Sequence, residues 1–205
     1  MKKIKLIIFD LDGVLIDSKL NMKLAWDYVK KNHKIKVSFY DYFKNIGIPF
    51  EDILFKLGIK NNIQKIKKTY SMGSIKYFNN IKLFKNAKSV IKELGKDYYL
   101  AVLTSKDKKR TNLIVKKFKL KFNSINCPIE GKKGKPNPWQ IKKVIKKYKL
   151  QKNQVIYIGD TKIDQKTAKN AGIKFLYTRY GYGGYQGLKN IKYSLKNIKE
   201  IYNYL

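Results

Sequence analysis

Cysteine is almost absent from this chain of 205 residues, because Cys127 is the only one. A single cysteine excludes a disulfide within the chain and is typical of a reducing compartment, so we expect a cytoplasmic location. Long apolar runs are also absent, and none approaches the roughly 18 residues of a membrane-spanning helix. The opening MKKIKLIIF is similar to the start of a signal peptide, but Asp10 and Asp12 interrupt its apolar part. We therefore expect no membrane partner.

Arginine is scarce although the chain is strongly basic. The formal net charge is +33, yet the only arginines are Arg110 and Arg179. Arginine is the preferred side chain for reading phosphates and guanines through paired hydrogen bonds, so a dedicated nucleic-acid-binding protein should have more of it. The lysines are also spread along the whole chain. We expect no specific nucleic-acid partner, only weak, salt-dependent binding to polyanions.

Histidine is represented only by His33, and the sequence has no G-x-S-x-G motif. A hydrolase with a Ser-His-Asp or Cys-His site would have to use this one histidine, which lies in a helical region apart from the predicted strands. We therefore expect His33 to be a surface or packing residue and Cys127 to be a small apolar core residue.

The sequence pattern is that of one folded domain with a modest insertion. Hydrophobic residues make up 43% of the chain, well above the level of a disordered tail. Helical patterns at 86–96, 109–120 and 138–150 alternate with short apolar runs that are typical of buried parallel strands. The strands are expected at 4–10, 98–105, 154–160 and 173–179. This alternation predicts an α/β fold, a Rossmann-like open parallel sheet with helices on both faces.

The region from about Asp17 to Asn80 interrupts the alternation. It contains no convincing strand, only helical patterns at 20–32, 49–58 and 61–70. A block of this length between the first two strands is too long for one crossover. We interpret it as a small, all-helical cap that is inserted over the strand ends. The predicted domains are residues 1–16 with 81–205 as the α/β core and residues 17–80 as the cap.

Polar side chains follow the predicted strands at the points where the strands end. Asp10 and Asp12 follow the first strand, and Asp160 follows the third. Because the carboxyl ends of parallel strands gather at one edge of the sheet, we expect these side chains to converge. The same edge would receive Thr104, Ser105, Lys135 and Asp164. Mg²⁺ prefers carboxylate oxygens and keeps positions for water and phosphate, so the sequence predicts a Mg²⁺ site for a phosphorylated substrate.

Four short motifs stand in order along the chain. They are the DxDG motif Asp10-Leu11-Asp12-Gly13, the strand-end hydroxyl residue Thr104, the KPxP motif Lys135-Pro136-Asn137-Pro138 and the GDxxxD motif from Gly159 through Asp160 to Asp164. In this order and spacing they resemble the haloacid dehalogenase-like phosphatase superfamily, especially its phosphoglycolate phosphatase-like branch with a small helical cap. The resemblance covers essentially the whole chain, and the helical insertion falls where that branch carries its cap.

The resemblance implies a Mg²⁺-dependent phosphatase that forms an aspartyl-phosphate. Asp10 would be the nucleophile, and Asp12 would protonate the leaving alcohol and then activate water. Thr104 and nearby backbone N–H groups would hold phosphoryl oxygens, and Lys135 would offset their charge. The expected phosphate-binding residues are Asp10, Leu11, Asp12, Thr104, Ser105 and Lys135, and the expected metal ligands are Asp10, Asp12 through its backbone carbonyl, Asp160 and Asp164.

Each assignment has a structural alternative. Asp10 and Asp12 could belong to an ordinary turn, Thr104 could cap the next helix, and Asp164 could be an exposed carboxylate in a first helical turn. Lys135 is singled out from neighbouring lysines only by its place before a proline. The segment from Arg179 to Gly187 is similar to a Gly-Tyr segment common in this branch, and a flexible surface loop is an equal alternative, so its role stays open.

The expected substrate is a small phosphorylated metabolite such as phosphoglycolate or a sugar phosphate. Asp12 argues against dehalogenase chemistry, because a halide leaving group needs no proton. A β-phosphoglucomutase-like mutase is the closest rival, but its cap carries a G-x-x-R segment where this chain has Gly47-Ile48-Pro49-Phe50. A non-catalytic, polyanion-binding descendant of the fold is the alternative from another class. The sequence indicates neither the exact substrate, nor the cap residues that set specificity, nor the oligomeric state.

Overall fold

A computed structural model of the chain describes residues 3–185, 188 and 191–205, so Gln186 and Gly187 of the glycine- and tyrosine-rich segment lie outside the described residues. Six parallel strands form its central sheet. Their bounds are β1 Leu6–Phe9, β4 Tyr99–Leu103, β5 Ser124–Asn126, β6 Val155–Gly159, β7 Lys174–Thr178 and β8 Ser194–Leu195. The strand order is β5-β4-β1-β6-β7-β8. The predicted open parallel sheet is therefore confirmed.

The four predicted strands correspond to β1, β4, β6 and β7. The two edge strands β5 and β8 have no counterpart in the prediction, because they are three and two residues long and carry polar residues. β1 lies at the centre of the sheet, with Leu6 opposite Tyr99 of β4 and opposite Val155 of β6. This central position places the residues after β1 and β6 side by side at the carboxyl edge.

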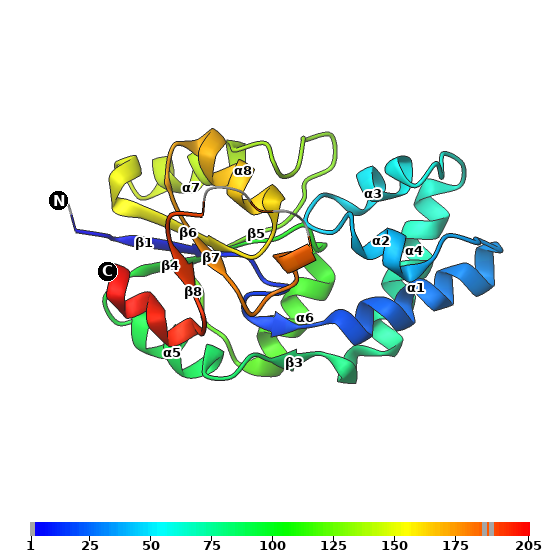
Figure 1. Cartoon of the computed structure of the whole chain (residues 1–205), viewed down its shortest axis with the longest axis horizontal. Helices are drawn as coiled ribbons and strands as arrows, with labels where there is room; N and C mark the ends of the chain where they lie inside the picture. Colours follow the sequence, from blue (N-terminus) through cyan, green and yellow to red (C-terminus); the bar gives the residue numbers. More distant parts are fainter. Residues whose placement is uncertain (1–2, 186–187, 189–190) are drawn as a thin grey trace.

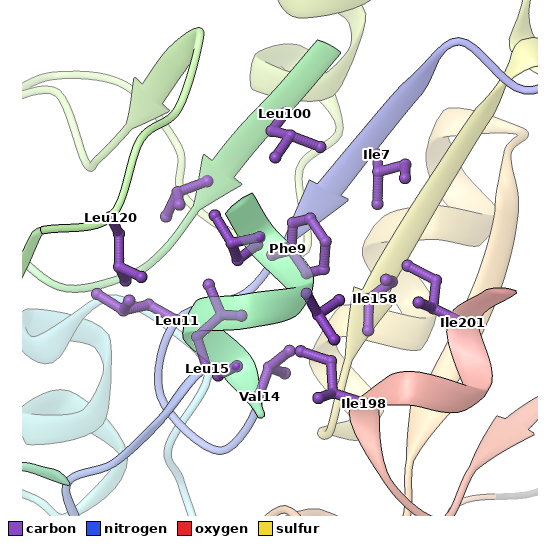
Figure 2. Close-up of a cluster of buried hydrophobic side chains, with 14 of the residues drawn as sticks. Ile7, Phe9, Leu11, Val14, Leu15, Leu100, Leu120, Ile158, Ile198 and Ile201 are labelled. Atoms are coloured by element: carbon purple, nitrogen blue, oxygen red, sulfur yellow. The ribbon is translucent and has the colours of Figure 1, made fainter. Parts of the chain in front are cut away.

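Helices cover both faces of the sheet. Their bounds are α5 Ala87–Leu94, α6 Lys108–Phe118, α7 Trp139–Lys147 and α8 Lys162–Ala171. Because side chains alternate along a strand, Ile7 and Phe9 of β1 pack into one buried cluster with α5 and α6, and Figure 2 shows this cluster. Leu6 and Ile8 pack into a second cluster with α7 and α8. The burial of both faces explains why these strands read as continuous apolar runs.

The four helices that lie between β1 and α5 in the sequence form a block with its own buried cluster. Their bounds are α1 Lys19–His33, α2 Phe39–Phe43, α3 Phe50–Lys56 and α4 Ile63–Lys76. The cluster includes Trp26, which stacks on Tyr42 with ring centroids 4.6 Å apart. Figure 1 shows this block on the right, beyond the carboxyl ends of the strands. We call it the cap.

Two short strands connect the cap to the sheet. β2 (Ile16–Asp17) pairs antiparallel with β3 (Lys82–Leu83). They lie close to the predicted boundaries at residues 17 and 80, and the division into 1–16 with 81–205 and 17–80 stays a prediction. Short 3₁₀ helices lie at η1 Phe78–Asn80, η2 Lys152–Gln154, η3 Gly183–Tyr185 and η4 Ile198–Tyr204. Within the described ranges, we find no helix that combines the length and the apolar character needed to cross a bilayer.

Candidate active site

Three carboxylates meet at the carboxyl ends of β1 and β6. Asp10 follows β1, Asp160 follows β6, and Asp164 lies in the first turn of α8. All three residues are buried, and one oxygen from each lies within 4.8 Å of the others. Charged carboxylates are rarely buried unless they are paired or bind a metal, so this cluster could hold a cation.

Asp160 is surrounded by backbone that approaches it closely. The N–H of Tyr182 donates to Asp160 Oδ2 at 2.6 Å. A Cβ atom on Gly13 would lie 2.0 Å from the same oxygen, and one on Gly181 would lie 2.3 Å from Asp160 Cβ. Gly13 also has a φ of +81°, which disfavours residues with a side chain. Both conformation and space therefore require glycine after Asp12.

Two oxygens of the cluster lack hydrogen bonds. Asp10 Oδ1 and Asp160 Oδ1 are buried, and neither accepts a hydrogen bond from any residue that the structure describes. Lys135 Nζ lies 3.1 Å from Asp10 Oδ1 as an ion pair, without hydrogen-bond geometry. Buried polar atoms nearly always have a partner, so these two oxygens need an explanation. A hard divalent cation such as Mg²⁺ fits them, because it binds carboxylate oxygens.

Lys135 is the cation inside the cluster. Its Nζ atom donates to Asp164 Oδ1 at 2.7 Å and to the Tyr157 hydroxyl at 3.3 Å, and that hydroxyl donates to Asp164 Oδ1 at 2.5 Å. The other Asp164 oxygen accepts from the N–H and the hydroxyl of Thr161, at 3.1 and 2.6 Å. Asp164 is fully buried, so the alternative of an exposed first-turn carboxylate is wrong.

Burial and the neighbouring charges shift the pKa values of these groups in opposite directions. Burial raises the pKa of Asp10 to about 7, although Lys135 lowers it. Burial together with Asp164 and Asp10 raises the pKa of Asp160 well above its usual range. Burial opposes the ionised form of Asp164 too, but Lys135 and the hydrogen bonds from Thr161 and Tyr157 together outweigh it and lower the pKa. Two of the three carboxyl groups therefore favour the protonated form more than a free carboxyl group does.

Asp12 is not part of this cluster of three carboxylates. Its Oδ1 atom accepts a hydrogen bond from the Ser18 hydroxyl and lies 3.1 Å from Lys106 Nζ. The Asp12 side chain is 15% exposed, whereas that of Lys106 is 4% exposed. Burial lowers the pKa of Lys106, although Asp12 raises it. Asp12 therefore lines the cavity with a partly exposed side chain, and one of its oxygens is fixed by two contacts.

The predicted phosphate-binding residues differ in what they can offer. Thr104 is buried and lines the same cavity as Asp10, and Asp107 rather than Thr104 caps α6, so helix capping does not account for Thr104. The Ser105 hydroxyl donates to the Gly47 carbonyl of the cap at 2.7 Å, so this side chain is already engaged. The Leu11 side chain lies in the apolar core. Leu11 could therefore contact a phosphoryl group only through its backbone.

A cavity opens between the strand ends and the cap. Asp10, Asp12, Thr104 and Lys135 line its core side. The cap side is apolar and aromatic, with Tyr42, Ile46, Ile48, Phe50, Ile53 and Tyr70. This arrangement places the charged groups on the floor of the cavity and the apolar surface opposite them.

Two cations in the cavity were not predicted as site residues. They are Lys106 and Arg110, both nearly buried. The Arg110 Nε atom lies 2.5 Å from Asp107 Oδ2, and its guanidinium lies over the Tyr70 ring at 5.1 Å. The available signals were the place of Lys106 two residues after Thr104 and the rarity of arginine in the chain. Neither signal indicates a site until the cap is placed over α6.

The remaining candidates lie away from the cavity. His33 Nε2 lies 2.8 Å from the Thr69 hydroxyl, between two cap helices. Cys127 is buried, and burial raises the pKa of its thiol. These positions agree with the packing roles that we expected. The glycine- and tyrosine-rich segment, in contrast, reaches the site, because the Tyr182 N–H binds Asp160.

Comparisons with known proteins agree with this geometry. The family model described as haloacid dehalogenase-like hydrolase matches residues 7–178, so the chain belongs to this family. A phosphoglycolate phosphatase of Vibrio cholerae is 25% identical over an alignment of 209 positions, which covers 93% of this chain and 91% of the relative. A pyrophosphatase, PpaX, of Oceanobacillus iheyensis is 21% identical over 207 residues, with 97% and 95% covered.

A solved structure shows the same fold. The haloacid dehalogenase-like family hydrolase of Streptococcus pneumoniae superposes with a TM-score of 0.85 at 24% identity, over 100% of this chain and 99% of that one. The predicted resemblance to this superfamily and to its phosphoglycolate phosphatase-like branch is confirmed. The prediction of an enzyme, a phosphatase, is confirmed with it.

Proposed function

We propose that the protein is a Mg²⁺-dependent phosphatase that hydrolyses a small phosphomonoester through an aspartyl-phosphate on Asp10. The observation that carries the proposal is the buried group of Asp10, Asp160 and Asp164, whose oxygens lie within 4.8 Å of one another beside a cavity. Asp10 Oδ1 and Asp160 Oδ1 have no hydrogen-bond donor among the described residues. Both features are expected of carboxylates that hold a divalent cation.

The carboxylates of Asp10, Asp160 and Asp164 would hold the metal, together with the backbone carbonyl of Asp12. When bound, Mg²⁺ supplies positive charge that offsets the repulsion between the carboxylates and a phosphate dianion. Lys135 adds a second positive charge from within the cluster, since its Nζ atom lies 3.1 Å from Asp10 Oδ1. The nucleophile and the phosphoryl group can then approach each other.

In the first half-reaction, an oxygen of Asp10 attacks the phosphorus and the bond to the ester oxygen breaks. Asp12 donates its proton to that oxygen, so the leaving group departs as an alcohol. Both contacts of the Asp12 carboxylate involve Oδ1, and Oδ2 is the atom that we assign to proton transfer. The products of this step are the free alcohol and phosphorylated Asp10.

In the second half-reaction, Asp12 takes a proton from a water molecule. The resulting hydroxide attacks the phosphorus, the bond between phosphorus and Asp10 breaks, and inorganic phosphate leaves. Asp12 is protonated again at the end of the cycle. Thr104, Lys135 and backbone N–H groups of Leu11 and Ser105 would hold the phosphoryl oxygens in both steps.

The cavity favours a leaving group with a negative charge of its own. Lys106 and Arg110 line the cavity, and Lys106 lies 3.1 Å from Asp12 Oδ1. A guanidinium has five N–H donors, of which the contact between the Arg110 Nε atom and Asp107 uses one. A carboxylate or second phosphate of the substrate could bind there. The names of the relatives include phosphoglycolate phosphatase and pyrophosphatase, which support such a substrate. We propose 2-phosphoglycolate as the first compound to test.

The mutase alternative is less well supported. A mutase of this superfamily uses a cap arginine, but both arginines of the chain lie outside residues 17–80, and the cap wall of the cavity is apolar. We retain residues 17–80 as the proposed cap domain and the cytoplasm as the proposed location. A small phosphorylated metabolite is the proposed partner.

The test is phosphate release from p-nitrophenyl phosphate with Mg²⁺ and with EDTA, for the native protein and for Asp10→Asn. We expect release that needs Mg²⁺ and that is lost in the variant. Release that survives in Asp10→Asn would exclude Asp10 as the nucleophile. Absence of release from this ester and from 2-phosphoglycolate would favour the polyanion-binding alternative.

A further inference from the structure

Tyr182 joins three parts of the molecule. Its backbone N–H donates to Asp160 Oδ2 at 2.6 Å, on the metal side of the site. Its hydroxyl donates to Asp17 Oδ1 at 2.9 Å and accepts from the Ser18 N–H at 2.6 Å, on the chain that leads into the cap. Its ring lies 5.3 Å from that of Phe43 in the cap. One nearly buried residue therefore contacts the carboxylate cluster, the linker and the cap.

Ser18 connects Tyr182 to Asp12. Ser18 is fully buried and occupies the N-cap position of α1. A serine there normally accepts a hydrogen bond from an N–H of the first helical turn. The Ser18 hydroxyl makes no such bond and instead donates to Asp12 Oδ1. A residue that gives up its local structural role for a contact in the site is expected where function requires it.

The glycines beside Tyr182 make these contacts possible. A Cβ atom on Gly181 would lie 2.3 Å from Asp160 Cβ, and one on Gly183 would lie 1.5 Å from the Asp160 carbonyl oxygen. Only glycine lets the segment lie against Asp160 this closely. The segment that could have been a surface loop is therefore packed against the site at these residues.

We propose that Tyr182 is a positioning residue for the proton transfer by Asp12. Its hydroxyl fixes the backbone N–H of Ser18 and the side-chain carboxylate of Asp17, and the Ser18 hydroxyl in turn fixes Oδ1 of Asp12. The other Asp12 oxygen is then held toward the leaving group. Because Ser18 begins the first cap helix, the alignment of Asp12 depends on the position of that helix. The inference rests on the proposed function, since it assigns the orientation of the same acid.

The test separates proton transfer from other effects by the choice of leaving group. Phenyl phosphate and p-nitrophenyl phosphate have similar shapes, but phenolate is much the poorer leaving group and depends more on a proton from Asp12. The value of kcat/KM reports the first phosphoryl transfer. General acid catalysis contributes about 10²–10⁴-fold, so we expect Tyr182→Phe to lower kcat/KM for phenyl phosphate about 10-fold and for p-nitrophenyl phosphate less than about 3-fold. The variant keeps the ring and the backbone N–H to Asp160.

Two further variants sharpen the test. Tyr180→Phe is the matched control, because among the described residues the Tyr180 hydroxyl donates to the Val14 carbonyl at 3.0 Å and makes no hydrogen bond with Ser18 or Asp17. We expect Tyr180→Phe to keep the native ratio of kcat/KM for phenyl phosphate to kcat/KM for p-nitrophenyl phosphate. Ser18→Ala removes the hydroxyl that donates to Asp12 Oδ1. It should lower this ratio of kcat/KM values, as Tyr182→Phe does. In the double variant, the fold-loss of kcat/KM for phenyl phosphate should be smaller than the product of the two single fold-losses, because both substitutions act through Asp12.

The outcomes are distinguishable. A selective loss on phenyl phosphate in Tyr182→Phe and Ser18→Ala supports the proposal. If Tyr182→Phe leaves the ratio of the two kcat/KM values unchanged, whether or not both values fall, the proposal is overturned while the proposed function stands. If the native protein hydrolyses neither ester nor 2-phosphoglycolate, the proposed function fails and the inference fails with it. Should Tyr182→Phe not fold, as judged by its thermal unfolding, Asp17→Ala takes its place, because it removes the carboxylate that accepts from the Tyr182 hydroxyl. The same selective loss on phenyl phosphate is then expected, and an unchanged ratio would overturn the proposal.

Discussion

The Nζ atom of Lys135 lies 2.7 Å from Oδ1 of Asp164, and both side chains are almost completely buried. The same ammonium lies 3.1 Å from Asp10 Oδ1. One lysine thus compensates two carboxylates of a group of three. A buried ion pair of this kind is weak evidence for stability, but removal of one partner leaves an uncompensated charge.

Lys135→Met should therefore destabilise the protein in a pH-dependent way. Loss of one partner of a buried pair costs about 3–5 kcal/mol. Without the lysine, the remaining carboxyl groups would have pKa values above those in the unfolded chain. The free energy of unfolding then falls as the pH rises from the unfolded pKa of such a group through its folded pKa. We expect a larger loss in the free energy of unfolding at pH 8 than at pH 5, measured by urea denaturation without metal. The exposed neighbour Lys132 provides the control Lys132→Met, which should cost little at either pH. Equal losses at the two pH values would contradict this role of Lys135.

Gly13→Ala tests the close contact between the first motif and Asp160. The added Cβ would lie 2.0 Å from Asp160 Oδ2 and would displace the carboxylate. Gly58 is a matched control, because it has a φ of +76° but no atom within 4 Å of a built Cβ. We expect Gly58→Ala to show only the conformational cost of about 1–2 kcal/mol and normal activity. Gly13→Ala should also weaken Mg²⁺ binding, measured by calorimetry, and reduce phosphatase activity about 10–100-fold, the usual cost of disturbing the groups that orient a metal ligand. Equal behaviour of the two variants would exclude the contact as the cause.

The positions of the strand-end residues could be predicted from the sequence, because a parallel sheet brings its carboxyl ends to one edge. The alternation of strands and helices is enough to place Asp10 and Asp160 at this edge. That they follow adjacent strands, β1 and β6, is a finding of the structure, because alternation does not determine the strand order. The edge strands β5 and β8 could not be predicted, since so few residues carry no periodicity. β5 is held instead by pairing with β4, and its Asn126 side chain donates to the Val102 carbonyl at 2.9 Å.

The residues that the sequence did not indicate are those whose contacts depend on the cap. Arg110 lies on a helix of the core, but its guanidinium reaches Tyr70 of the cap. Tyr182 is far from Ser18 in the sequence and contacts it only because the segment after β7 lies beside the segment that leads into the cap. Spacing along the chain contains no information on such pairs. Ser105, in contrast, was predicted from its position, and its hydroxyl is engaged by the cap.

Binding of Mg²⁺ should release protons below neutral pH. Burial raises the pKa of Asp10 to about 7 and raises that of Asp160, so without metal these groups hold protons at pH 6. The metal needs the ionised carboxylates, and its apparent affinity should therefore rise as the pH increases through about 7, the pKa of Asp10. Calorimetry at pH 6 and pH 8, each in two buffers of different ionisation enthalpy, measures the release. We expect more protons released at pH 6 than at pH 8, and less release in Asp10→Asn. Equal release by native protein at both pH values would contradict the raised pKa of Asp10.

Arg110→Gln should change substrate selectivity rather than the chemical step. 2-Phosphoglycolate and ethyl phosphate differ mainly in the carboxylate, which we expect Arg110 to bind. A hydrogen bond to a charged group contributes about 1.5–3 kcal/mol, so kcat/KM for 2-phosphoglycolate should fall about 10–100-fold, whereas kcat/KM for ethyl phosphate should stay within about 3-fold. The only other arginine gives the control: Arg179 donates from Nε to the Ser194 hydroxyl at 2.9 Å, in an exposed position, and Arg179→Gln should leave both values unchanged. An equal fall for both esters in Arg110→Gln would mean that Arg110 holds the cap through Tyr70 and does not read the substrate.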